Sequence, residues 1–219
     1  MKRIGVLVSG GGTNLQALLD AQTHGILKSG AVALVVSDKP GAYALTRAEN
    51  AGVETRVIEK KDYKDRDAFS AALADCMEEK QIDLVVMAGF MTIVTEAFFG
   101  RFAGRIINVH PALIPSFCGD GFYGLRVHRA VLDYGVKLTG ATVHFVDGVT
   151  DGGAIILQKC VAVEDGDTPE TLQKRVMEQA EWEILPQAAE LFCAGRLTLN
   201  GRWVKIDSCL CWKGWWFTW

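Results

Sequence analysis

Short apolar runs alternate with amphipathic segments along most of the chain. The apolar run 4–8 predicts a buried strand. The segment 14–24 predicts a helix, because Leu15, Leu18 and Leu19 recur at the spacing of one helical face. Alternation of strands and helices is typical of βαβ units. We therefore predict an α/β fold with a doubly wound, mostly parallel sheet and a Rossmann-like N-terminal half.

The same pattern continues toward the C-terminus. Further strands are predicted at 31–36, 55–58, 84–87, 106–109, 141–146 and 154–163. Further helices are predicted at 42–51, 66–80, 127–134 and 168–193. The last helix begins with Thr168 as N-cap and Pro169 in its first turn. Asn200-Gly201 predicts a tight hairpin between 197–199 and 203–206.

No linker, repeat or break in composition precedes residue 207, so we expect a single domain over 1–207. The end of the chain, 208–219, differs from it, since tryptophans crowd a segment without periodicity. We expect this tail to be disordered or artefactual, with a natural interaction tail as the alternative. It is left out of the fold argument.

Composition limits the classes of function. The 219 residues are 49% hydrophobic and 22% charged, with a net charge of −3, which indicates an ordinary globular protein without a broad basic surface for nucleic acid. Small anions stay possible, because backbone N–H groups bind phosphate. There is no secretory signal, no transmembrane-length apolar run and no C-x-x-C among the six cysteines. We expect a cytoplasmic protein with reduced thiols, without membrane or nucleic-acid partners, and monomeric or homodimeric.

A glycine loop joins the first predicted strand to the first predicted helix. It reads Ser9-Gly10-Gly11-Gly12-Thr13-Asn14. Glycines allow close approach of a ligand, and a helix N-terminus presents unpaired N–H groups, so phosphate is the natural ligand. The loop matches no nucleotide fingerprint. On these residues alone, a plain connecting turn remains open.

Polar and glycine residues follow three apolar strands. Besides the glycine loop, Ala88-Gly89-Phe90-Met91 follows one strand and Asn108-Val109-His110 ends another. In an open parallel sheet, ligands gather at the carboxyl ends of strands where strand order reverses. We therefore expect the three segments to adjoin one pocket, with Phe90, Met91, Ile93 and Val94 on its apolar wall, although each of these four also fits plain core.

Asn108, His110 and Asp151 are the candidates for chemistry. His110 titrates near neutrality and suits general acid/base catalysis, whereas a core-edge histidine bonded to backbone is the alternative. Asn108 lies two positions earlier on the same face, where its amide suits an oxyanion. Asp151 precedes Gly152-Gly153 and is expected to pair with His110, raising its pKa and favouring the imidazolium, or to be an ordinary turn aspartate.

Other nucleophiles and metals are less well supported. Cys118 lies in the loop after His110, but no base is placed beside it in sequence. His128 and His144 have no metal-ligand spacing with His110, and we expect no metal. We expect a structural or supporting role for His144. No G-x-S-x-G elbow is present, so a serine hydrolase lacks its nucleophile.

These segments together resemble the folate-dependent phosphoribosylglycinamide formyltransferase family. The resemblance covers about residues 2–206. It rests on the glycine loop, on 88–91, on Ile107-Asn108-Val109-His110-Pro111, and on Thr142-Val143-His144-Phe145-Val146 leading to Asp151-Gly152-Gly153. The loop 116–124 is longer than in many relatives, so the entrance to the folate site is expected to differ. The tail has no recognisable counterpart.

The resemblance implies a substrate and a role for each group. It implies formyl transfer from 10-formyltetrahydrofolate, a co-substrate, to the amine of the glycinamide ribonucleotide in purine synthesis. Asn108, His110 and Asp151 are then catalytic. The phosphate and ribose are implied to meet Gly12, Thr13, Asn14 and Glu181. The folate is implied to meet Arg66, Met91, Thr92, Ile93, Val94, Asn108, Asp147 and the rest of the loop to Asp151.

Three alternatives remain at this point. A related hydrolase that removes formate from the same folate carries an extra N-terminal domain, for which a first strand at Ile4 is expected to leave no room. A relative that formylates initiator transfer RNA needs a second, basic domain. A folate or nucleotide sensor on the same scaffold needs no acid/base group, so binding without turnover would favour it.

Overall fold

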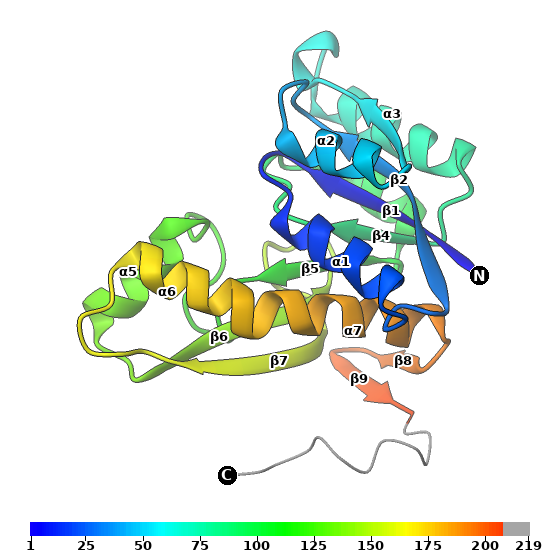
Figure 1. Cartoon of the computed structure of the whole chain (residues 1–219). Coiled ribbons are helices and arrows are strands. Elements are labelled where there is room, and N and C mark those ends of the chain that lie inside the picture. The colour runs from blue at the N-terminus through cyan, green and yellow to red at the C-terminus, as the bar shows by residue number, and fades with distance from the viewer. Residues whose placement is uncertain (208–219) are drawn as a thin grey trace.

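The computed structural model describes residues 1–207 and consists of a twisted seven-stranded sheet with helices on both faces, plus a small hairpin (Figure 1). The strands are β1 (Lys2–Val8), β2 (Gly30–Ser37), β3 (Glu54–Val57), β4 (Leu84–Met87), β5 (Ile106–His110), β6 (Leu138–Phe145), β7 (Ile155–Ala162), β8 (Leu197–Asn200) and β9 (Trp203–Ile206). The predicted tail at 208–219 lies outside the described residues.

The α-helices cover the sheet in order. They are α1 (Thr13–Thr23), α2 (Tyr43–Asn50), α3 (Arg66–Glu79), α4 (Glu96–Phe99), α5 (Leu125–Tyr134), α6 (Pro169–Val176) and α7 (Trp182–Cys193). Two short 3-10 segments, η1 (Lys60–Asp62) and η2 (Gly100–Phe102), and a π-helical turn, η3 (Met177–Glu181), complete the set.

The sheet has the order β3-β2-β1-β4-β5-β6-β7. The first five strands of this order are parallel, whereas β6 runs antiparallel to both β5 and β7. The predicted α/β class, with its Rossmann-like half, is confirmed. Strand order reverses between β1 and β4, which places the expected ligand crevice at their carboxyl ends.

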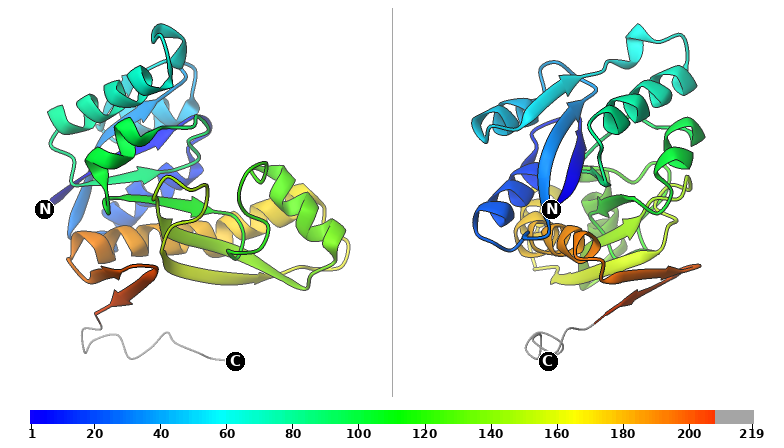
Figure 2. Two further views of the ribbon diagram at one scale, coloured as in Figure 1. Left: turned by 180° about the vertical axis from the view of Figure 1, so that it is seen from behind. Right: turned by 90° about the vertical axis from the view of Figure 1, so that its right-hand side faces the viewer.

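Each face of the sheet has its own apolar cluster. Helices α1, α2 and α7 cover one face and α3 and α4 the other, as the views from behind and from the side show (Figure 2). Leu15 and Leu18 are fully buried on the first face, and Phe69 and Leu73 on the second. The helical spacing predicted from sequence is therefore the spacing of core positions. No helix among residues 1–207 is long and apolar enough to cross a membrane.

The predicted helix 168–193 is interrupted. Thr168 caps α6 with Pro169 in its first turn, as predicted, but a π turn, η3, separates α6 from α7. The one sequence signal for this was Pro186 inside α7, since proline lacks the N–H that closes an α-turn and clashes with the carbonyl four residues earlier. Single π turns are frequent at functional sites.

Gly153 holds the returning chain against β6. A Cβ at this position would lie 1.7 Å from the Phe145 carbonyl oxygen, so only glycine fits.

We expect Gly153→Ala to lower the free energy of unfolding by about 2–4 kcal/mol, because the backbone must move to admit the methyl group. Urea unfolding checks this. Gly41→Ala, with open space around it and no positive φ, is the control and is expected to change stability by less than about 0.5 kcal/mol. Equal effects of the two substitutions would contradict the packing argument.

Candidate active site

The candidate site lies where the carboxyl ends of β1, β4 and β5 adjoin. The Met91 backbone N–H donates to Ser9 Oγ at 2.9 Å, so the loop after β4 is bonded to the glycine loop after β1. Met87 at the end of β4 pairs with Asn108 in β5. The prediction that the three strand ends meet is confirmed.

The glycine loop exposes the N-terminus of α1. Gly12 caps the helix in a left-handed conformation (φ 72°) without a side-chain cap, and a Cβ there would lie 2.6 Å from Ala44 Cβ. The Gly10 carbonyl accepts from the Ala44 N–H at 3.0 Å, and the Gly11 carbonyl accepts from Arg47 Nε at 2.8 Å. Residues of helix α2 thus bond to the loop carbonyls, which would otherwise repel an anion. The first-turn N–H groups of α1 remain available to bind an anion.

Glu181 lies beside this helix start. It belongs to the π turn η3 and is 6% exposed, and Asn14 Nδ2 donates to its Oε2 at 2.7 Å. Burial raises the pKa of Glu181 to about 7, although the bond from Asn14 opposes the rise. The fold therefore joins two residues that sequence assigned to the ribonucleotide, although 167 positions separate them.

His110 and Asp151 form the centre of the site. His110 Nδ1 lies 3.3 Å from Asp151 Oδ2, and both side chains are nearly buried. His144 Nε2 lies 3.7 Å from the other carboxylate oxygen. The expected pairing of His110 with Asp151 is confirmed, and His144 approaches the same carboxylate.

His144 orients the amide of Asn108. Its Nδ1 lies 2.8 Å from the Phe145 carbonyl, which only accepts, so Nδ1 carries the proton. In the neutral ring Nε2 then accepts from Asn108 Nδ2, which lies 3.2 Å away. One amide N–H is thereby used, and the second remains for another acceptor. This is the supporting role that sequence analysis expected for His144.

Both nitrogens of His110 face acceptors. Nε2 donates to the Phe117 carbonyl oxygen at 2.9 Å, and Nδ1 faces Asp151. A neutral ring protonated at Nε2 leaves a lone pair toward the carboxylate, whereas the imidazolium donates to both groups. Proton uptake at Nδ1 therefore completes the hydrogen bonding.

The net pKa of His110 differs from the expectation. Burial lowers the pKa of His110, and Asp151 and the Phe117 carbonyl raise it by less, so the net shift from 6.5 is downward. Asp151 acts in the predicted direction, raising the pKa of His110, but burial of the ring outweighs it, so the net shift is opposite to the expected one. The pKa of Asp151 is lowered: burial raises it, but His144, His110 and the Gly119 N–H lower it by more. Asp151 is thus favoured as the anion beside the His110 ring.

The loop 116–124 reaches into the same centre. The Gly119 N–H donates to Asp151 Oδ2 at 2.9 Å, and Thr150 Oγ1 donates to Asp120 Oδ1 at 2.8 Å. Asp151 itself has φ 52°, a strained value for a non-glycine residue. Sequence analysis missed the contacts of Phe117 and Gly119, because they are made by backbone atoms that carry no side-chain signal.

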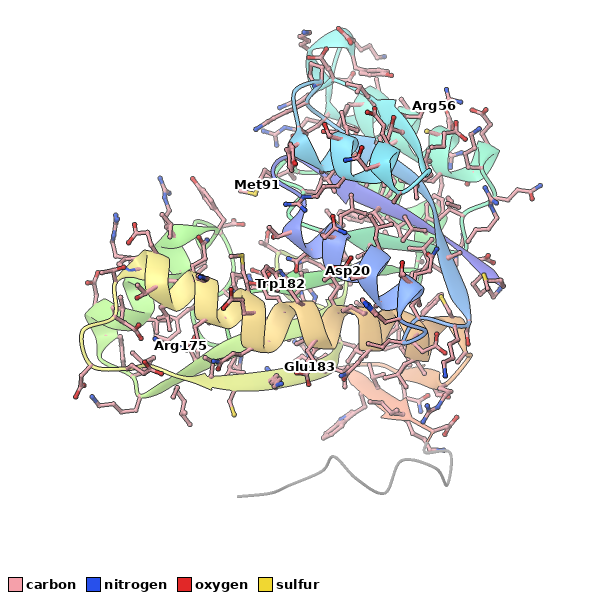
Figure 3. The ribbon with its side chains drawn as sticks, viewed as in Figure 1. Asp20, Arg56, Met91, Arg175, Trp182 and Glu183 are labelled. Carbon is pink, nitrogen blue, oxygen red and sulfur yellow. The ribbon has the colours of Figure 1, made fainter. Side chains whose placement is uncertain are left out.

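The predicted folate residues occupy different environments. Met91 and Ile93 are 52% and 66% exposed, and Met91 projects from the edge of the sheet (Figure 3). Val94 is buried in the cluster on the α3 face, in line with the plain-core alternative. Arg66 lies exposed in the first turn of α3, and Asp147 is exposed in the loop after β6. No described contact joins these two to His110, so their roles stay predictions.

One cavity lies between helices, apart from His110 and His144. It measures about 390 Å³, and its lining includes Thr13 and Arg47 but no member of the Asn108–His110–Asp151 group. It lies between α1 and α7, where Asp20 and Trp182 are seen on adjoining helices (Figure 3). A second cavity of about 240 Å³ is lined in part by Asp147.

This geometry fits a group-transfer site, because a helix start with free N–H groups, an amide donor and a histidine paired with a carboxylate lie at one sheet edge. A comparison with protein families agrees, since residues 2–189 match the formyl transferase model. The chain belongs to the formyl transferase family.

Individual relatives are more specific. The chain is 39% identical over 203 residues to phosphoribosylglycinamide formyltransferase of Escherichia coli (strain K12), covering 93% of this chain and 92% of that one. It is 46% identical over 209 residues to the trifunctional purine biosynthetic protein adenosine-3 of Bos taurus. This match covers 94% of this chain but only 20% of the length of that relative. The crystal structure of glycinamide ribonucleotide transformylase 1 from Symbiobacterium toebii superposes with a TM-score of 0.90 at 46% identity over 95% of each chain.

Burial of Glu181 makes stability depend on pH. Because its folded pKa of about 7 exceeds the ordinary value of 4.5, its stabilising contribution is present below pH 4.5 and is lost as pH rises through 7. We expect Glu181→Gln to remove this slope, making the variant more stable than the parent above pH 7 by on the order of 2–3 kcal/mol. Denaturant unfolding across pH 4.5–8 measures it. Glu178→Gln, an exposed residue on the same turn, should keep the slope; an unchanged slope in Glu181→Gln would contradict the assignment.

The Asp151 carboxylate opposes the effect of burial on His110. We expect Asp151→Asn to lower the pKa of His110 further below 6.5, because the charge that favours the imidazolium is removed while burial stays. NMR titration of the His110 ring measures it. Asp147→Asn, in the same loop and exposed, is the matched control and should leave the titration unchanged. A His110 pKa that rises in Asp151→Asn would show that the carboxylate does not act on the ring as described.

Proposed function

We propose that this protein transfers the formyl group of 10-formyltetrahydrofolate to the amine of 5-phosphoribosylglycinamide, a step of purine biosynthesis. The observation that carries the proposal is the His110–Asp151 pair at 3.3 Å beside the Asn108 amide, at the edge of the sheet where the glycine loop opens. The names of the relatives supply the formyl acceptor, and the glycine loop fits its phosphate.

The reaction begins with attack of the glycinamide amine on the formyl carbon. A tetrahedral intermediate forms directly, so no enzyme nucleophile is required. Its oxyanion accepts the second N–H of Asn108, which His144 holds in place. Asn108 therefore works as a preorganised donor rather than as a flexible amide.

His110 moves the proton. Nδ1 stays toward Asp151, and Nε2 exchanges the Phe117 carbonyl for the reacting nitrogen when the substrates bind, so that the ring takes the proton that the attacking amine loses. The new imidazolium is stabilised by Asp151 and then gives the proton to the departing folate nitrogen. The anion of Asp151 thus acts when charge develops on the ring.

The two substrates occupy opposite sides of this pair. Gly12, Thr13 and Asn14 bind the phosphate at the start of α1, and Glu181 binds the ribose hydroxyls. Met91, Thr92 and Ile93, with the 147–151 loop and Arg66, form the folate side, and Val94 supports this segment from the core. The Asn108 amide meets the formyl group between the two substrates. No metal takes part in this proposal.

A folate hydrolase is the second candidate. It would use the same three residues with water in place of the amine, and deformylation without the ribonucleotide would favour it. A binding-only protein would show folate binding without turnover. The neutral base beside a buried carboxylate supports the transferase over a sensor.

A spectrophotometric assay tests the proposal. Deformylation of a 10-formyl folate analogue should require the ribonucleotide. His110→Ala should lower kcat by about 10²-fold or more with the fold intact, because it removes the proton carrier. His24→Ala, an exposed histidine outside the trio, is the control and should keep kcat. A near-normal rate in His110→Ala would overturn the assigned role.

A further inference from the structure

The segment after β4 is fixed at separate points by four different elements. The Ala88 N–H bonds to the carbonyl of Leu7 in β1, and Met91 bonds to Ser9 in the glycine loop. Further along, the Thr95 N–H donates to Ser70 Oγ in α3 at 3.0 Å. Between these points, Met91 and Ile93 project outward as exposed apolar side chains.

The remaining attachment is a side-chain pair at the centre of the segment. Thr92 Oγ1 donates to Asp38 Oδ2 at 2.5 Å. Asp38 follows β2 directly, is 8% exposed, and its second oxygen, Oδ1, has no hydrogen-bond partner among residues 1–207. A buried carboxylate with one partner is costly, so its retention calls for a role that an apolar residue does not fill.

The position of this pair links it to the ligand crevice. Thr92 stands between the two exposed side chains in sequence, and its hydroxyl is bonded to the residue that follows β2. Fixing Thr92 fixes the direction in which its neighbours Met91 and Ile93 project. A wall whose side chains are held before the ligand arrives loses less conformational entropy on binding.

We propose that Asp38 is a positioning residue that sets the specificity of the folate side of the site. It does so by holding the Thr92 hydroxyl and, through it, the apolar wall formed by Met91 and Ile93. This inference rests on the proposed function for the identity of the ligand. Asp38 contacts neither the glycine loop nor the His110–Asp151 pair among the described hydrogen bonds, so it acts on one substrate and not on the chemistry.

The test uses substitutions at both ends of the bond. Thr92→Val removes the hydroxyl at constant shape, and Asp38→Ala removes the acceptor. Each should raise the KM for the formyl folate by about tenfold while kcat and the KM for the ribonucleotide change less than twofold. The folate KM of the double variant should be no higher than that of the more impaired single variant, because both substitutions break the same hydrogen bond.

Conservative variants provide the matched controls. Asp38→Asn keeps an acceptor oxygen and should retain the parental KM for folate, and Thr92→Ser keeps the donor and should restore part of the folate affinity lost in Thr92→Val. Thermal unfolding of every variant separates positioning from loss of fold. An unchanged folate KM in Thr92→Val, or an equal rise in both KM values, would overturn the inference.

The outcome is distinguishable from failure of the proposed function. An inactive parent protein would refute the function, and fluorescence titration with a non-reactive folate analogue would then still test the wall: weaker binding in Thr92→Val than in Thr92→Ser supports it, and equal binding refutes it. An active parent with additive effects of Asp38→Ala and Thr92→Val would refute the positioning role alone. If Asp38→Asn proved as poor as Asp38→Ala, the carboxylate charge, and not the bond to Thr92, would be the determinant, and the inference would fail.

Discussion

The site depends on one buried anion, the carboxylate of Asp151. Its two oxygens meet His110, His144 and the Gly119 N–H, which come from three different segments of the chain. These groups keep its pKa low despite burial, so a fixed negative charge faces the His110 ring. Burial lowers the pKa of His110, and this charge raises it. The lowered pKa favours the neutral ring, and the Asp151 charge stabilises the ring when it accepts a proton, which suits a base that later serves as an acid.

The sheet brings the rest of the site to this anion. Parallel strands β1, β4 and β5 end at one edge, the antiparallel strand β6 pairs His144 with Asn108, and the loop after β6 brings Asp151 to His110. The glycine loop offers N–H groups there because α2 engages its carbonyls. The π turn adds Glu181 from the far end of the chain. One edge thus combines an anion site, an oxyanion donor and a proton carrier, each held by elements whose main role is to cover the sheet.

Much of this could be predicted from the sequence, for identifiable reasons. Apolar periodicity marked the helix faces of α1 and α3, and glycine and polar residues after apolar strands marked the edge. The pairing of Asp151 with His110 followed from residue chemistry. The π turn could not be located from the sequence, because helical periodicity hardly changes across one wide turn. The sign of the His110 pKa shift depends on how deeply the ring is buried, which only the fold reveals. The contacts of Phe117 and Gly119 are made by backbone atoms, so no residue type in the sequence indicates them.

The measurement that tests the central claim most directly follows the formyl carbon itself. The protein would be incubated with 10-formyltetrahydrofolate labelled with ¹³C in the formyl group, together with the glycinamide ribonucleotide. NMR would then locate the label. The account predicts a labelled formamide on the ribonucleotide and no labelled formate, because the amine attacks the formyl carbon beside His110 and Asn108. Label released as formate at the same rate with and without the ribonucleotide would contradict the account and identify water as the acceptor.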